Sequence, residues 1–414
     1  MGMFILIENG DLYTPESKGQ QSVLLANEHI IKVGDVSRKS VEALGVDVEV
    51  IDASGCIVAP GFIDPHQHLL GGSGEEGFSS QTPEISTSEI VQAGITTVVG
   101  CLGADTTMKT LAGLLAKVKG LKEEGLNAYM WSGGYNMPPT SISGSVRDDV
   151  MFIEEVIGAG EVAIADERSS QPTPHELARL SHDVYVAGML SRKAGVIHLH
   201  IGKGKQRLQI LRDVIKDHAV RPEWLYATHI SRSEKLMLEA IDLAKDGCYV
   251  DIDTVDENLA ECLKFYLENS GWEEKLTFSS DASITSPATL FKQVRSCIVD
   301  EKFPIETILP FITSNTAAAL KLPHKGRVAA GMAADVLVIE RHGFEIREVI
   351  SRGRRLVKEG SVDFREKFLE ESNRNIVLEG VKANGHANGN GSPHHFGHKQ
   401  QRTAVAEAVR CEGK

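Results

Sequence analysis

The sequence predicts an α/β fold, a (β/α)8 TIM-like barrel joined to a small β-sandwich built from both chain ends. Between residues 59 and 323, β-like apolar runs alternate with amphipathic helical segments, a pattern typical of βα units around a parallel sheet. There are eight such runs, which is the number needed to close this kind of barrel. We expect the strands at 58–64, 96–102, 128–132, 161–166, 196–200, 225–229, 249–253 and 276–280.

Short β-like runs separated by Asn, Gly and Asp turn signals also mark the two ends of the ordered sequence. The early runs fall at 4–8, 22–26, 30–33 and 48–51, and the late ones at 326–329, 334–339, 348–351 and 354–357. Neither set alone is long enough to bury much surface. We therefore expect residues 1–58 and 324–375 to form one β-sandwich domain, with the barrel domain 59–323 inserted between them.

Helices are expected at 111–124, 150–157 and 235–245, where apolar residues recur at helical spacing. Ser145 and Ser233 precede the last two and are candidate N-caps. Residues 380–414 are rich in Asn, Gly and His. Such a composition buries too little apolar surface to order itself, so we predict a disordered tail.

Composition narrows the function classes. The chain has 414 residues, 42% of them hydrophobic, enough for a large core. Its net charge of −13 argues against a nucleic-acid partner. No apolar run reaches membrane-spanning length, and residues 1–7 lack the basic start of a signal peptide, so we expect a cytoplasmic protein. The six cysteines show no paired spacing, which favours free thiols in a reducing compartment.

Two histidines, His66 and His68, follow the first expected barrel strand. Because side chains on an extended segment repeat with period two, both imidazoles project to the same side. They can therefore bind one metal ion together.

Three further candidate ligands lie at the carboxyl ends of expected strands: His200 and His229 end theirs, and Asp281 follows the last one. Groups at the carboxyl ends of barrel strands converge on one mouth, whatever their separation in sequence. We therefore expect these three side chains and the histidine pair to form one metal site.

These ligands resemble those of the amidohydrolase superfamily of metal-dependent hydrolases, and within it the isoaspartyl (β-aspartyl) dipeptidases. The narrower resemblance rests on five short motifs: GGSGE at 71–75, TPE at 82–84, SGGY at 132–135, DERS at 166–169 and THISR at 228–232. It covers residues 1–375.

The resemblance implies hydrolysis of an isopeptide bond by a metal-activated hydroxide, with two zinc ions per subunit and other divalent transition metals left open. His66, His68 and Asp281 would hold one ion, and His200 and His229 the other. The carboxylate of Asp281 would take the proton of the water and deliver it to the leaving nitrogen. The hydroxyl of Tyr135 would support the oxyanion.

The bridge between the metals departs from the family pattern, because Glu161 stands where the family usually has a carboxylated lysine. A glutamate can also bridge two cations, but it is shorter, so either the metals shift towards this strand or only one binds tightly. Amino-sugar N-deacetylases of the superfamily use a glutamate ligand. That activity, a cyclic-amide hydrolase and a non-catalytic barrel therefore remain alternatives.

A β-aspartyl dipeptide carries one amine and two carboxylates. The resemblance assigns Glu75 to the amine and Arg168 and Arg232 to the carboxylates, which forked guanidiniums match well. Thr285 stands where the family has a carboxylate-binding serine, and Ser73 is a further substrate contact.

One position near the substrate lacks the hydroxyl that the family uses, because Ala104 is found there. The preferred residue on the C-terminal side of β-Asp therefore stays open. The expected partner is a small dipeptide, and the resemblance also implies a homo-oligomer.

Overall fold

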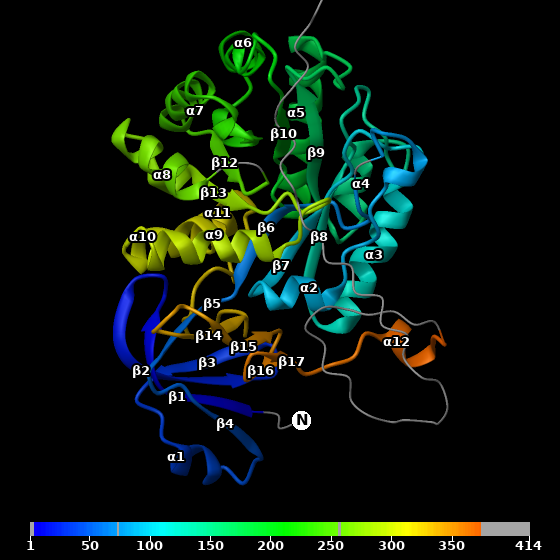
Figure 1. Ribbon diagram of the computed structural model, residues 1–414. Helices are drawn as coiled ribbons and strands as arrows, with labels where there is room; N and C mark the ends of the chain where they lie inside the picture. The colour runs from blue at the N-terminus through cyan, green and yellow to red at the C-terminus, as the bar shows by residue number, and fades with distance from the viewer. Residues whose placement is uncertain (1–3, 73, 256–257, 374–414) are drawn as a thin grey trace, which may run out of the picture. The chain divides into compact units, whose positions relative to one another are not determined.

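The computed structural model describes residues 4–72, 74–255 and 258–373 (Figure 1). It contains an eight-stranded parallel sheet and a separate nine-stranded sheet that is mostly antiparallel. The predicted fold class, a TIM-like barrel with a small β unit, is thereby confirmed. The predicted tail at 380–414 lies outside the described residues.

All eight predicted barrel runs contain strands, and these pair in sequence order. A backbone hydrogen bond of 2.9 Å from His68 N to Ala282 O links the first strand to the segment after the last one, so the barrel is nearly closed. The strands are β6 Phe62–Gln67, β7 Ile95–Gly100, β8 Asn127–Ser132, β9 Val156–Ile164, β10 Ile197–Ile201, β11 Leu225–Thr228, β12 Tyr249–Asp253 and β13 Leu276–Ser279.

Helices lie between successive strands and surround the barrel (Figure 1). Both predicted caps are present: Ser145 accepts a hydrogen bond from Asp148 N, and Ser233 accepts one from Leu236 N. The helices are α2 Thr87–Gln92, α3 Leu111–Glu124, α4 Val146–Phe152, α5 Pro174–Ser191, α6 Gln209–Asp217, α7 Glu234–Asp246, α8 Leu259–Glu268, α9 Ala288–Val299, α10 Ile305–Ile312 and α11 Ser314–Ala319.

The predicted helix at 150–157 is wrong in its second half. Helix α4 ends at Phe152, and strand β9 already begins at Val156. The apolar residues of two different elements fall at helical spacing by coincidence. Between them, Glu155 O accepts a hydrogen bond from Met130 N, which starts the pairing of β9 with its neighbour.

The second sheet is built from both ends of the chain, as predicted. Its central contact is between β5 and β14, where Val58 pairs with Val338 in antiparallel register. The predicted strand at 326–329 is absent from this described segment. The strands are β1 Phe4–Tyr13, β2 Ser17–Ala26, β3 His29–Gly34, β4 Val48–Asp52, β5 Cys56–Pro60, β14 Val336–Glu340, β15 Ile346–Ser351, β16 Arg354–Lys358 and β17 Ser361–Val362. Two short helices, α1 Arg38–Glu42 and α12 Lys367–Glu371, accompany it.

The predicted strand at 58–64 is two strands in different sheets. β5 belongs to the second sheet, whereas β6 opens the barrel. The two strands are separated at Gly61. A Cβ at this position would lie only 2.1 Å from the Thr96 hydroxyl oxygen, so the close approach of the backbone to Thr96 requires glycine. This break directs β6 into the barrel and carries His66 and His68 to its mouth.

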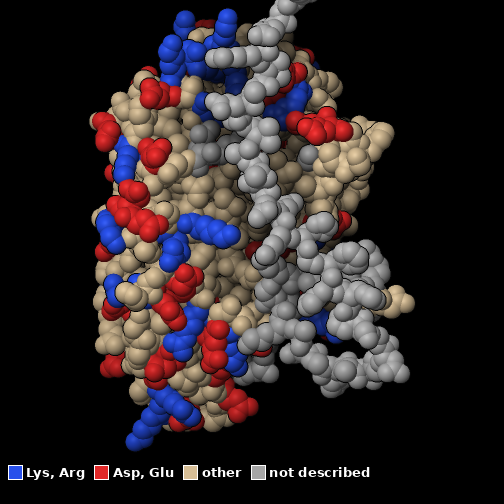
Figure 2. Space-filling view, in the orientation of Figure 1, with Lys and Arg blue, Asp and Glu red and all other residues tan. Residues whose placement is uncertain are grey.

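Charged side chains of both signs are interspersed along the described surface that is visible in Figure 2. None of the described helices is long and apolar enough to cross a membrane.

Candidate metal and active site

The six predicted metal ligands come together at the carboxyl ends of the barrel strands. Their ligand atoms form overlapping groups in which all atoms lie within 4.8 Å of one another. The six are His66, His68, Glu161, His200, His229 and Asp281. Strands that are far apart in sequence thus meet at one mouth, as the barrel geometry requires.

Glu161 on β9 lies at the centre of this cluster and is fully buried. Its Oε2 atom is 3.1 Å from His66 Nε2 and 3.7 Å from His68 Nε2. Its Oε1 atom is 2.9 Å from His200 Nδ1 and 3.3 Å from His229 Nε2. Each carboxylate oxygen therefore faces a different pair of imidazoles.

Asp281 follows β13 and contacts the first histidine pair. Its Oδ1 atom is 3.2 Å from His66 Nε2 and 3.1 Å from His68 Nε2, and its Oδ2 atom is 3.9 Å from His229 Nε2. Asp281 and His229 both have positive φ, at 46° and 64°. This backbone conformation is uncommon for residues other than glycine.

Two further aspartates orient the second pair of imidazoles. Asp166 Oδ2 is 2.9 Å from His200 Nε2, and Asp253 Oδ2 is 2.7 Å from His229 Nδ1. Such carboxylates fix the ring and its tautomer, so that the other nitrogen can serve as a ligand. Sequence reasoning did not assign Asp253, although it ends the seventh predicted strand and the strand-end rule that found the ligands also covers it.

The electrostatics of the cluster favour cations. Burial raises the pKa of the Glu161 carboxyl, but the nearby His66 and His200 outweigh it and hold that pKa well below its ordinary value. Burial lowers the pKa of His66, whereas the carboxylates of Glu161 and Asp281 raise it well above its ordinary value. These shifts favour an ionised Glu161 and positive charge at His66, whereas burial, followed by the charge of His229, lowers the pKa of His200.

Several buried polar atoms of this cluster have no hydrogen-bond partner among the described residues. They are His66 Nδ1 and Nε2, Glu161 Oε2 and Asp281 Oδ1. Leaving such an atom unsatisfied costs about 1–3 kcal/mol or more. Glu161 Oε2 and Asp281 Oδ1 lie 3.1 and 3.2 Å from His66 Nε2, and nitrogen and oxygen donors suit zinc and related divalent ions. The residues therefore fit a bound transition metal.

Tyr135, on the loop after β8, points into the same cluster. Its hydroxyl is 2.7 Å from His200 Nδ1. Burial, followed by the charge of Glu161, raises the pKa of Tyr135 well above its ordinary value, so the hydroxyl keeps its proton and can donate it in a hydrogen bond.

The three charged residues assigned to the substrate also lie together. Arg168 donates from Nε to Asp166 Oδ1 at 2.9 Å and from Nη1 to Glu75 Oε1 at 2.6 Å. Arg232 donates from Nη1 to Ile201 O at 2.5 Å, and the same nitrogen is 3.1 Å from His200 Nε2. Two guanidiniums and one carboxylate thus stand at the rim of the predicted metal cluster.

A cavity of about 230 Å³ joins these groups, and a wider one of about 910 Å³ lies beside it at the mouth. Ala104 lines the smaller cavity. Thr285 is not among its described lining residues, although the Thr285 hydroxyl is buried without a described hydrogen-bond partner. Ser73 lies outside the described residues. The smaller cavity is lined by residues that include His68, Glu75, Tyr135, Arg168, His200, Arg232 and Asp281.

Sequence reasoning missed one further side chain of the cluster. Cys101 follows β7, and its Sγ atom lies 3.6 Å from His68 Nδ1. In the sequence it was counted only as a free thiol, because a cysteine at the end of an apolar strand is usually a packing residue.

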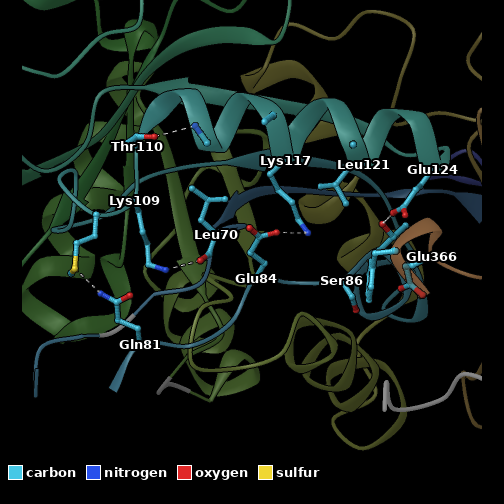
Figure 3. Close-up of a pocket in the computed structure, with 16 residues that line it drawn as sticks. Leu70, Gln81, Glu84, Ser86, Lys109, Thr110, Lys117, Leu121, Glu124 and Glu366 are labelled. Atoms are coloured by element: carbon cyan, nitrogen blue, oxygen red, sulfur yellow. Dashed lines mark hydrogen bonds and ion pairs between the residues drawn. The ribbon is translucent and has the colours of Figure 1, made fainter. Parts of the chain in front are cut away.

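Another cavity, of about 660 Å³, lies beside α3 (Figure 3). Its wall holds an ion pair between Lys117 and Glu84 at 3.2 Å, and Lys109 donates a hydrogen bond to Leu70 O. None of the predicted site residues is among the described residues that line it.

Known proteins share this architecture. The family model described as "Amidohydrolase family" matches residues 57–356. A beta-aspartyl dipeptidase from Fervidobacterium islandicum AW-1 is 37% identical, with a TM-score of 0.84, and the match covers 88% of this chain and 99% of that one. A structure of that enzyme in complex with beta-Asp-Leu dipeptide matches at 35% identity and a TM-score of 0.82, with the same coverage. A dihydroorotase from Clostridium acetobutylicum is 28% identical over 172 residues, which is 39% of this chain and 35% of that protein.

Proposed function

This chain belongs to the amidohydrolase family, and we propose that it hydrolyses the isopeptide bond of β-aspartyl dipeptides with the help of divalent metal ions. The observation that carries the proposal is the position of Glu161, with one carboxylate oxygen facing each pair of imidazoles. The likeness to beta-aspartyl dipeptidase over most of both chains supports it.

The metal ligands divide into two sets. His66, His68 and Asp281 are assigned to one ion and His200 and His229 to the other, with Glu161 between them. When bound, these ions, with zinc as the first choice, would activate a water molecule and polarise the scissile carbonyl.

The chain's own residues move the protons. Asp281, beside both sets of ligands, takes the proton of the attacking water and passes it to the leaving nitrogen. The Tyr135 hydroxyl now faces His200 Nδ1. When that nitrogen serves as a ligand, the hydroxyl is free to donate to the oxyanion that develops on the substrate.

The charges at the rim match the substrate. A β-aspartyl dipeptide has one ammonium group and two carboxylates, and Glu75, Arg168 and Arg232 supply the complementary groups. Glu75 and Arg168 pair with each other at 2.6 Å, but the Glu75 side chain is 62% exposed. Exposed pairs contribute only about 0–1 kcal/mol, so substrate can replace this pair at little cost.

A second candidate is a cyclic-amide hydrolase, which the partial likeness to dihydroorotase favours. A cyclic substrate with a single carboxylate would use one guanidinium, leaving the other arginine and Glu75 without a charged partner. The β-aspartyl dipeptide uses all three, and this makes it the better match.

We also propose that the protein works in the cytoplasm. The described cysteines Cys56, Cys101, Cys248, Cys262 and Cys297 are all free thiols, which suits a reducing compartment. The homo-oligomer implied by the resemblance stays a prediction.

The test compares β-Asp-Leu with α-Asp-Leu, dihydroorotate and an N-acetylated amino sugar as substrates of the purified protein. The expected result is selective hydrolysis of β-Asp-Leu that is lost on chelation and restored by zinc. Faster turnover of the cyclic amide or the amino sugar, or activity insensitive to complete metal removal, would contradict the proposal.

A further inference from the structure

Cys101 occupies a position equivalent to that of the predicted metal ligands. It directly follows β7, as Asp281 follows β13, so it belongs to the same mouth of the barrel. It is only 1% exposed and lines the small cavity with His68 and Asp281. We propose that its thiolate is a direct ligand of the metal ion held by His66 and His68. This inference rests on the proposed function and adds a ligand to the same site.

Distances within the cluster suit a shared ion. Cys101 Sγ, His66, His68 and Glu161 form a group in which all ligand atoms lie within 4.8 Å of one another. With the usual zinc bond lengths and an angle of about 110° between two ligands, a sulfur and a nitrogen ligand lie about 3.6 Å apart, and a nitrogen and an oxygen ligand about 3.4 Å apart. The observed separations are 3.9 Å from Cys101 Sγ to His68 Nε2 and 3.1 Å from Glu161 Oε2 to His66 Nε2.

The Cys101 thiol also lies near His68, the histidine of the first pair that is farther from the Glu161 carboxylate. Glu161 Oε2 is 3.1 Å from His66 Nε2 but 3.7 Å from His68 Nε2. Cys101 lies on the His68 side, 3.6 Å from Nδ1 and 3.9 Å from Nε2. A thiolate there would add a ligand on the side that Glu161 Oε2 approaches less closely.

Charge favours the same assignment. Two divalent cations bring four positive charges, while Glu161 and Asp281 bring one negative charge each. A thiolate at Cys101 would add a third anion in a buried setting, where uncompensated charge is costly. Sulfur ligands select zinc, and do not suit magnesium or manganese, so Cys101 would also set the metal preference.

The competing interpretation is a neutral packing thiol. Cys101 Sγ is 3.5 Å from Gln67 O, to which a protonated thiol can donate a weak hydrogen bond. Metal binding requires loss of that proton, so the two interpretations differ in whether sulfur bonds to the metal.

The test uses cobalt(II) as a spectroscopic probe in the metal-stripped, full-length protein. Wild type should show an intense near-ultraviolet sulfur-to-cobalt charge-transfer band. Cys101→Ser should lose that band while it still binds cobalt at the other ligands. Cys248→Ala is the matched control, because Cys248 is equally buried but precedes β12 at the opposite end of the barrel.

Zinc affinity provides a second readout. The zinc Kd of Cys101→Ser should rise by at least the roughly 10–100-fold that is typical of losing an outer-shell partner of a metal ligand. The zinc Kd of Cys248→Ala should match that of wild type.

The test separates failure of the Cys101 assignment from failure of the proposed function. Cobalt-loaded wild type that hydrolyses β-Asp-Leu without a charge-transfer band would overturn the role of Cys101 and leave the proposed function standing. A band that persists in Cys101→Ser would also overturn it. Absence of any stoichiometric metal in active protein would overturn both. If Cys101→Ser does not fold, X-ray absorption at the zinc edge of wild type decides by the presence or absence of a sulfur neighbour.

Discussion

Two buried glutamates at opposite ends of β9 have contrasting surroundings. Glu155, just before the strand, has a side chain 3% exposed, and its Oε1 accepts hydrogen bonds from Lys119 at 3.0 Å and Lys122 at 2.9 Å. Glu161, near the mouth, is fully buried among four imidazoles, and its Oε2 has no hydrogen-bond partner among the described residues.

The difference lies in what neutralises the charge. Burial raises the pKa of Glu155, but the two ammonium groups outweigh it and lower that pKa to about 2. Those cations are permanent parts of the chain. The imidazoles around Glu161 are neutral when they act as metal ligands, so in the metal-loaded site the bound cations would compensate its charge. Glu155, at the end of the barrel opposite the mouth, thus contributes to stability, whereas Glu161, near the mouth, is placed to bind metal.

The largest effect should come from Glu161→Ala. It removes the anion that both ligand sets share, so the protein should lose metal, mainly from the ion at His200 and His229, and its activity should become undetectable. The metal content and activity of Glu161→Gln should lie between those of Glu161→Ala and wild type, because glutamine keeps an oxygen donor without the charge. Elemental analysis and β-Asp-Leu kinetics measure both. Glu155→Gln is the control and should retain full metal content. If Glu161→Ala kept its metal and activity, another carboxylate would be the bridge, with Asp166 and Glu167 the nearest candidates in sequence.

Tyr135→Phe should be the next most severe change at the mouth. Loss of one oxyanion donor typically lowers kcat by about 10²–10³-fold. Metal content should stay unchanged, since the hydroxyl is not a ligand. Tyr129→Phe is the control, since Tyr129 lies on β8, the strand that precedes the Tyr135 loop, and it should keep wild-type kcat. Equal kcat values for the two variants would remove Tyr135 from the mechanism.

Arg168→Met and Arg232→Met should each lower kcat/KM for β-Asp-Leu by an amount equivalent to about 2–4 kcal/mol. Each change removes a charge-assisted contact and leaves a substrate carboxylate unpaired. The fold should remain intact. Arg179→Met removes an exposed charge on α5 and should leave the kinetics unchanged. Unaltered kcat/KM in both mouth variants would refute the substrate assignment.

The smallest kinetic effect and a clear stability effect are expected for Glu155→Gln. At pH 7 the free energy of unfolding should fall by about 1–3 kcal/mol, because two lysines lose their anion while kcat/KM stays the same. Since the folded pKa of Glu155 is depressed to about 2, its stabilisation is present above about pH 4.5 and is lost as the pH falls towards 2. Denaturation in urea at pH 7 and pH 3.5 should show the gap between wild type and variant narrowing in acid. A difference in unfolding free energy between wild type and variant that is the same at both pH values would show that the ion pairs do not cause it.

The barrel and its ligands could be predicted from the sequence because both obey simple periodic rules. Alternating β-like and helical runs located all eight strands, and ligands at strand ends converge whatever their spacing. The break at Gly61 could not be predicted, because the apolar run continues through it and only the approach of Thr96 requires glycine. The end of α4 was hidden in the same way by apolar residues of β9.

The supporting residues were harder to predict than the ligands. The sequence does not indicate that Arg168 pairs with its near neighbour Asp166 and with the distant Glu75, because these contacts depend on loop conformation. Asp253 ended one predicted strand and Cys101 was the next-to-last residue of another, but aspartates and cysteines at such positions are more often caps and packing residues. Only their contacts with His229 and His68 in the folded structure distinguish them from such residues.

The central claim is that Glu161 lets this site bind its metals without a carboxylated lysine. The most direct measurement strips the metal and titrates zinc back in buffer free of bicarbonate, following bound zinc and β-Asp-Leu hydrolysis together. We predict that both recover in parallel and that added bicarbonate changes neither, because a glutamate carboxylate needs no carbon dioxide. Recovery only in the presence of bicarbonate, or full hydrolysis by the metal-free protein, would contradict it.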